Sequence, residues 1–126
     1  EALGLAAGFF ASPLAEDLFA RAAAAGVPPE PEVPFIAKPW QGGPLVNGVM
    51  DLVFPLPEET VVVDFKTDRV EAPEAHRFQM AVYRTAAEEI WGRPARAWLY
   101  YLRSGGTVRC REPLPAWDSG AQGGET

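Results

Sequence analysis

A run of three valines that ends in an acid and a base constrains this chain most. Val61–Val63 is apolar at consecutive positions, and Asp64 and Lys66 follow it two residues apart. A strand that is apolar on both faces belongs in the centre of a sheet covered on two sides. Asp64 and Lys66 leave the same face of such a strand. The sequence therefore predicts a central strand over residues 60–66 that carries a carboxylate and an ammonium group side by side.

Turn residues and periodicity divide the rest of the chain into helices and strands. Ser12 and Pro13 are typical of a helix start, and Gly26 of its end. Gly92 similarly ends a longer helix that we expect over residues 73–91. We expect further strands over 32–38, 45–54, 95–102 and 107–111, of which 32–38 contains prolines that suit a sheet edge. This order predicts an α/β fold in which helices flank a mixed central sheet.

Two finer predictions concern which side chains are buried. Alternation along residues 45–54 puts one set of side chains on each face of the strand: Val49, Asp51 and Val53 on one, Met50, Leu52 and Phe54 on the other. At 100° per residue, the long helix has a buried stripe (Ala75, Phe78, Val82, Ala86), a solvated side (Arg77, Arg84, Glu88) and a line beside the stripe (His76, Gln79, Tyr83). The third line can reach a cleft next to the sheet.

Composition excludes several classes of protein. The 126 residues suit one domain, with residues 112–126 as a tail. The single cysteine, Cys110, excludes an iron–sulfur cluster held within this chain and suits a reducing compartment, so we expect a cytoplasmic protein. No segment has the length and apolar character of a membrane span, and no glycine-rich phosphate loop provides a nucleotide site.

Paired carboxylates indicate the chemistry. Asp51 lies thirteen residues before Asp64, on the strand expected to pair with it, so one hairpin brings both acids and Lys66 together. Mg²⁺ prefers oxygen ligands and keeps open positions for phosphate and water. A lysine beside the metal can stabilise the attacking hydroxide. The sequence therefore predicts metal-assisted cleavage of a phosphodiester, although an Asp-x-Lys motif alone is more often a salt-bridged surface.

Five motifs in order resemble a known family. Glu32-Val-Pro-Phe35, Gly48-x-x-Asp51, Asp64-Phe-Lys-Thr-Asp68 and Gln79-x-x-x-Tyr83 follow a Phe10…Ser12-Pro13-Leu14 segment. Together they resemble the RecB-like nucleases of the PD-(D/E)XK superfamily, above all the C-terminal nuclease domains of RecB/AddA-type helicase–nucleases. The resemblance implies a restriction-endonuclease-like core. It also implies that residues 1–126 are a single nuclease domain from the C-terminal part of a larger helicase–nuclease.

The resemblance assigns roles to individual residues. It implies a catalytic set of Asp51, Asp64, Lys66, Gln79 and Tyr83. It implies Mg²⁺, with Mn²⁺ as a substitute, held by Asp51, Asp64 and the Phe65 carbonyl, with Glu32 as an auxiliary ligand. Gln79, Tyr83 and His76 would contact DNA. Two departures stand out: no histidine precedes Asp51, which implies a fragment or an incomplete metal site, and His76 occupies a position where relatives often have tyrosine.

The implied function is a Mg²⁺-dependent DNA exonuclease module of a bacterial recombination or repair helicase–nuclease that processes DNA ends. Its partners would be DNA and a helicase motor in the same polypeptide or complex. Two alternatives stay open: a catalytically inactive pseudo-nuclease with a structural or DNA-guiding role, and a protein-interaction module, which the net charge of −6 favours.

Several residues have simpler interpretations. Glu58 and Glu59 read as a solvated turn, and Asp68 and Arg69 as a local ion pair. Tyr83 could equally be a ring at the edge of the core. The four tryptophans are expected to be packing residues: Trp40, Trp91, Trp98 and Trp117.

Overall fold

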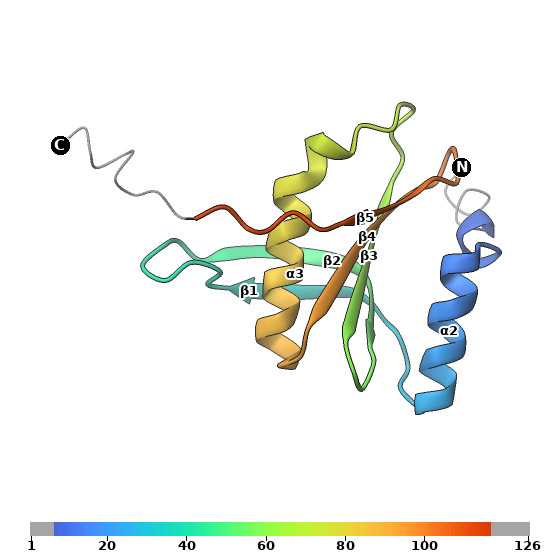
Figure 1. Ribbon diagram of the computed structural model, residues 1–126, viewed down its shortest axis with the longest axis horizontal. Helices are drawn as coiled ribbons and strands as arrows, with labels where there is room; N and C mark the ends of the chain where they lie inside the picture. Colours follow the sequence, from blue (N-terminus) through green and yellow to red (C-terminus); the bar gives the residue numbers. More distant parts are fainter. Residues whose placement is uncertain (1–6, 117–126) are drawn as a thin grey trace.

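The computed structural model describes residues 7–116, which form one mixed five-stranded sheet with helices on both faces (Figure 1). The strands lie in the sheet in the same order as in the chain: β1 (Glu30–Ala37), β2 (Val46–Pro55), β3 (Thr60–Lys66), β4 (Ala95–Tyr101) and β5 (Thr107–Cys110). The predicted α/β class is confirmed, and β1 occupies the predicted sheet edge.

The pairing of β3 explains why its valines are buried on both faces. It pairs antiparallel with β2 and parallel with β4, so it lies in the middle of the sheet. A parallel pair needs a crossover, which is supplied by a short 3₁₀ helix, η1 (Pro73–His76), and then α3 (Arg77–Trp91). Val62 packs beneath α3, whereas Val61 and Val63 pack on the side of α2 (Pro13–Ala25). The central-strand prediction is therefore confirmed.

Helix α2 begins and ends where the sequence predicts, and α3 ends at the predicted Gly92 but begins only at Arg77, after the 3₁₀ turn. The Ser12 hydroxyl accepts a hydrogen bond from the Ala15 amide at 3.2 Å and caps α2. Gly26 and Gly92 follow the two helices in left-handed conformation, with φ of 69° at each. Figure 1 shows α2 and α3 on opposite sides of the strands β3, β4 and β5. None of the helices within residues 7–116 is long and apolar enough to cross a membrane.

Strand β2 does not keep a simple alternation of faces. Met50 and Val53 both pack in the core beneath α3, although three positions separate them, and Val49 is 49% exposed. The predicted division of faces is therefore wrong at Val49 and Met50. Glu32 lies across from this break on β1, between the paired positions Pro31–Leu52 and Val33–Met50, and has a positive φ of 50°. The β1–β2 pair therefore departs from regular geometry next to Asp51.

The buried face of α3 is rotated from the predicted one. Val82 and Ala86 are buried as expected, but Ala75 and Phe78 are exposed. The buried side chains are Met80, Ala81, Val82, Tyr83, Ala86 and Ala87. Because the first turn is 3₁₀, α3 proper starts only at Arg77, and the helix meets the sheet further along its length. Arg84 is also not simply solvated, since it donates to the backbone carbonyls of Cys110 and Glu112.

The residues after β5 run across α3 as far as the structure describes them (Figure 1). Besides the Arg84 contact, Leu114 packs against the core, and the Trp40 indole N–H donates to the Pro115 carbonyl at 2.6 Å. Residues 112–116 are therefore held against the domain. Trp91 and Trp98 pack against the two cores as predicted, whereas Trp117 lies outside the described residues.

The prediction of a solvated turn at Glu58–Glu59 is wrong for Glu59. Its side chain is only 11% exposed and contacts Arg21 of α2 at 2.8 Å and Arg96 of β4 at 2.7 Å. Glu58 is 64% exposed and shares the Arg21 guanidinium at 2.8 Å. Partners from distant parts of the chain, one before and one after Glu59, converge only in the fold. The β2–β3 turn is therefore tied to both a helix and a neighbouring strand.

Candidate active site

The predicted acids meet at the point where β2 and β3 stop pairing. Leu52 and Val63 are the last paired residues, and Asp51 and Asp64 are the next residues on their strands. The Asp51 Oδ2 atom accepts a hydrogen bond from the Phe65 amide at 2.9 Å, which fixes the first carboxylate against the end of β3. The structure thus brings Asp51, Asp64 and Lys66 together, as the predicted hairpin requires.

Asp64 is buried with incomplete compensation of its charge. Its residue surface is 3% exposed, and within the described residues its Oδ2 atom has no hydrogen bond. The Lys66 Nζ atom lies 2.9 Å from Oδ2 and forms an ion pair with it. The pKa of Asp64 is raised to about 6, chiefly by burial; Lys66 opposes this rise and the neighbouring Asp51 carboxylate adds to it. The ammonium group of Lys66 contacts Asp64, whereas the carboxylate of Asp51 is held by a backbone amide.

Lys66 is also the first link in a chain of polar contacts to α3. Its Nζ atom donates to Gln79 Oε1 at 2.9 Å, and Gln79 Nε2 donates to the Tyr83 hydroxyl at 3.0 Å. Gln79 and Tyr83 lie four residues apart on one side of the helix, which lets the amide reach both neighbours. Burial and the charge of Asp64 raise the pKa of Tyr83, so its hydroxyl stays protonated. All five predicted catalytic side chains therefore belong to one connected group.

The donor set fits a hard divalent cation. Asp51 and Asp64 supply carboxylate oxygens, and the hydrogen-bond deficit of Asp64 Oδ2 leaves a buried acceptor that a cation would satisfy. The Phe65 amide points toward Asp51, whereas the Lys66 carbonyl accepts from the Leu102 amide on the other side of β3. Because the N–H and C=O of one strand residue point to the same side, the Phe65 carbonyl faces β2 beyond the last pair.

Glu32 and His76 do not belong to this hydrogen-bonded group, although Glu32 lies across from Asp51 on β1. Glu32 is exposed on β1, and within residues 7–116 no three His, Cys, Asp or Glu side chains gather to hold a metal ion. Its role as a ligand stays a prediction. His76 Nε2 lies 2.8 Å from Asp68 Oδ2, so Asp68 pairs with His76 rather than with Arg69 as expected. This pair lies just before α3 and is not part of the chain of contacts described above.

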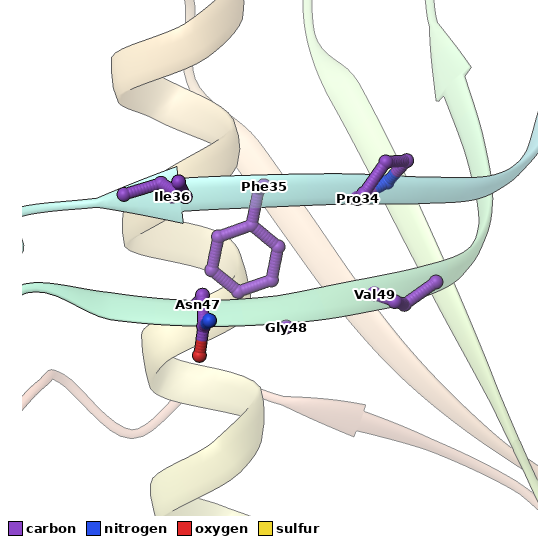
Figure 2. A pocket seen from close by; sticks show the side chains of 6 residues that line it. All are labelled: Pro34, Phe35, Ile36, Asn47, Gly48 and Val49. Carbon is purple, nitrogen blue, oxygen red and sulfur yellow. The ribbon is translucent and has the colours of Figure 1, made fainter.

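A hollow elsewhere on the described surface does not contain the site residues. It has a volume of about 620 Å³ and lies over the outer face of β1 and β2 (Figure 2). Its lining contains no titratable or nucleophilic side chain: Pro34, Phe35, Ile36, Asn47, Gly48 and Val49. A smaller groove beside Gln79 and Tyr83 also involves Phe35, Asn47 and Gly48. The sequence does not predict this groove, for which the glycine at position 48 is the only local signal.

Several known proteins are similar to this chain in sequence. The family described as the PD-(D/E)XK nuclease superfamily matches residues 6–122. An ATP-dependent helicase/nuclease subunit from Anoxybacillus flavithermus (strain DSM 21510 / WK1) is 36% identical over 60% of this chain and 7% of its own length. The proteins of the same description from Geobacillus thermodenitrificans (strain NG80-2) and Geobacillus kaustophilus (strain HTA426) are 43% and 39% identical over 44% and 51% of this chain, and 6% of their own length.

The chain spans less than a tenth of the length of these curated relatives. The crystal structure of SSO0001 aligns with 90% of this chain and 59% of its own, with a TM-score of 0.47 and 18% identity.

Proposed function

Since this chain belongs to the PD-(D/E)XK nuclease superfamily, we propose that it is a Mg²⁺-dependent DNA nuclease that hydrolyses phosphodiester bonds at DNA ends. Similarity to helicase/nuclease subunits supports DNA as the substrate and a helicase motor elsewhere in the same polypeptide or complex. In that setting the module would act as an exonuclease in recombination or repair, in the cytoplasm of a bacterium.

One observation supports the proposal most strongly, namely the buried Asp64 carboxylate beside Asp51. Burying an acid next to a second acid costs free energy in the absence of a cation, which is why the pKa of Asp64 rises to about 6. If this position served only to stabilise the end of the sheet, an uncharged residue would make the fold more stable. Strongly perturbed carboxylates in a cleft are typical of functional sites.

The side chains of this group divide the work. Asp51, Asp64 and the Phe65 carbonyl would hold Mg²⁺, which when bound stabilises negative charge on a phosphate. Lys66, held between Asp64 and Gln79, would orient the attacking water and favour its deprotonated form. Gln79, in turn fixed by Tyr83, keeps the ammonium in place and can contact the scissile strand. His76 as a DNA contact and Glu32 as an additional ligand complete the proposal.

The test is cleavage of linear single- and double-stranded DNA by the 126-residue chain with Mg²⁺ or Mn²⁺. Asp64→Ala and Lys66→Ala should each abolish cutting, whereas Asp17→Ala, which changes an exposed acid on α2, should leave it unchanged. Calorimetric titration with Mn²⁺ should show binding that Asp64→Ala removes. No cutting and no metal binding by the wild-type chain would contradict the nuclease proposal and favour the inactive structural or DNA-guiding domain.

A further inference from the structure

A groove beside the candidate active site has aromatic and amide walls. It has a volume of about 210 Å³ and lies between α3 and the β1–β2 pair. Gln79 and Tyr83 line it, and both belong to the chain of contacts that starts at Asp64. The other walls used here are Phe35, Asn47, Gly48 and Phe78. The groove is therefore continuous with the group of residues proposed to cut DNA.

The groove is open because residue 48 has no side chain. A Cβ atom at Gly48 would lie 3.0 Å from Phe35 Cε1 and 3.6 Å from Tyr83 Cε1. The rings of Phe35 and Tyr83 meet edge to face, with centroids 5.6 Å apart and planes at 86°. These two buried rings therefore form a firm inner wall, and a larger residue at position 48 would press on it.

Phe78 forms the outer aromatic wall of the groove and is unusually exposed for a large apolar residue. It is 55% exposed although it lies in the first turn of α3, one residue before Gln79. Trp40 stacks on it, with ring centroids 5.9 Å apart and planes at 20°. Trp40 in turn donates its indole N–H to the Pro115 carbonyl. A second ring thus supports Phe78 while leaving it at the groove, which is the arrangement of a stacking platform.

We propose that this groove receives one unpaired nucleobase of the DNA strand, stacked on Phe78, with the Gln79 amide at its polar edge. The proposal rests on the nuclease function above and assigns it a substrate class, DNA that is single-stranded or frayed at its end. A net charge of −6 gives little general attraction for phosphates. Stacking on an aromatic ring needs no positive charge, and it accepts any base whose face is exposed.

The direct test is the affinity of the 126-residue chain for a fluorescein-labelled single-stranded oligothymidylate, measured by anisotropy with Ca²⁺ in place of Mg²⁺. Phe78→Ala should weaken binding by about 5- to 100-fold, and Phe78→Trp should retain it to within about twofold. Ile36→Ala is the matched control, because Ile36 is 71% exposed and its side chain lies on the outer face of β1 (Figure 2). It should bind like the wild type.

Two further DNA ligands show whether Phe78→Ala loses affinity because base stacking is lost or because the binding surface is disturbed in some other way. An oligonucleotide with one abasic position near the cut should bind the wild type more weakly but should make no difference to Phe78→Ala. A relaxed, covalently closed circular duplex presents no unpaired base, so its binding should not depend on Phe78. Urea unfolding of each variant establishes that the fold is retained.

The outcomes distinguish the two proposals. If Phe78→Ala binds single strands as the wild type does, or if Ile36→Ala loses as much affinity, the stacking site is wrong. Asp64-dependent cutting by the wild type would leave the nuclease function standing in that case, with a protein segment as the remaining occupant of the groove. A wild-type chain that neither binds nor cuts DNA would overturn both proposals.

Discussion

At the scale of single residues, the site depends on how far each buried charge is compensated. Asp51 is fixed by a backbone amide, whereas Asp64 has only the charge of Lys66, which is shared with Gln79. An isolated buried carboxylate prefers its neutral form. The acid at the end of β3 therefore ionises less readily than an exposed carboxyl, and a divalent cation would stabilise its anion.

This incomplete compensation predicts how pH changes the stability of the metal-free protein. The pKa of Asp64 is about 6 in the folded state, above about 3.9 in an unfolded chain. Its contribution to stability is present below about pH 4 and is lost as the pH rises through about 6. In EDTA, the free energy of unfolding of Asp64→Asn should exceed that of the wild type by a margin that grows by about 2–3 kcal/mol between about pH 4 and pH 7.

Urea denaturation of both proteins at a series of pH values measures that margin. Mg²⁺ in place of EDTA should reduce it at neutral pH, because the ion binds only the wild-type site. A margin that stays constant with pH would show that Asp64 does not titrate as its surroundings require.

The chain from Lys66 to Tyr83 predicts unequal effects of two substitutions on catalysis. Tyr83→Phe removes one acceptor of Gln79 but leaves the Lys66 contact, so kcat should fall about fivefold. Gln79→Ala removes the neutral partner of the ammonium, and kcat should fall about 10- to 100-fold. Thr85→Ala is a control on the same helix, since Thr85 bonds only to the Ala81 carbonyl of its own helix. Single-turnover cutting rates measure all three. Equal losses for Tyr83→Phe and Gln79→Ala would contradict the proposed order of contacts, in which Gln79 holds Lys66 directly and Tyr83 acts only through Gln79.

At the scale of secondary-structure elements, long-range ion pairs hold the domain where the backbone turns. Glu59 links the β2–β3 turn to α2 and β4 through Arg21 and Arg96. Glu59→Gln keeps the shape of the side chain but leaves both guanidinium groups without their shared anion. The free energy of unfolding should fall by about 1–3 kcal/mol relative to the wild type. Added salt should change this difference little, because the carboxylate is buried and its ion pairs are weakly screened.

Glu58→Gln provides the matched control. Glu58 contacts the same Arg21 but is mostly exposed, so its loss should change stability little. Urea denaturation at low and moderate salt compares the two variants. If Glu58→Gln lowers the free energy of unfolding as much as Glu59→Gln does, burial does not determine how much each ion pair contributes to stability.

The same elements show what a sequence can and cannot predict. Capping residues and apolar runs are local, so α2, β3 and their ends follow from Ser12, Gly26 and the three valines. The partners of Glu59 and Asp68 depend on tertiary contacts, and composition alone could not reveal them. Periodicity alone puts Phe78 on the wrong face, because the helix phase is set by where α3 meets the sheet. The Asp51–Asp64 pair was predictable because adjacent strands of a hairpin bring their ends together.

At the scale of the whole molecule, the acidic charge limits how DNA can be held. The chain carries 17 acidic and 11 basic residues, and several of the basic side chains are engaged within the domain: Arg21, Lys66, Arg84, Arg93, Arg96 and Arg103. Arg21, Lys66 and Arg96 are paired with carboxylates, and the acids outnumber the bases, so the domain has little net attraction for phosphates. Strong retention of DNA would therefore come from a partner domain, and the domain itself would contribute positioning and chemistry.

This balance predicts a shallow salt dependence for single-strand binding by the isolated chain. Each neutralised phosphate adds about 0.7 to the slope of log affinity against log salt concentration for a single strand. With few phosphate contacts, the slope should be below about 2 in magnitude, whereas stacking on Phe78 should be nearly insensitive to salt. Anisotropy titrations over a range of NaCl concentrations measure the slope, and Phe78→Ala should lower affinity without changing it. A slope of about 4 or steeper would show that phosphate contacts dominate binding despite the net negative charge.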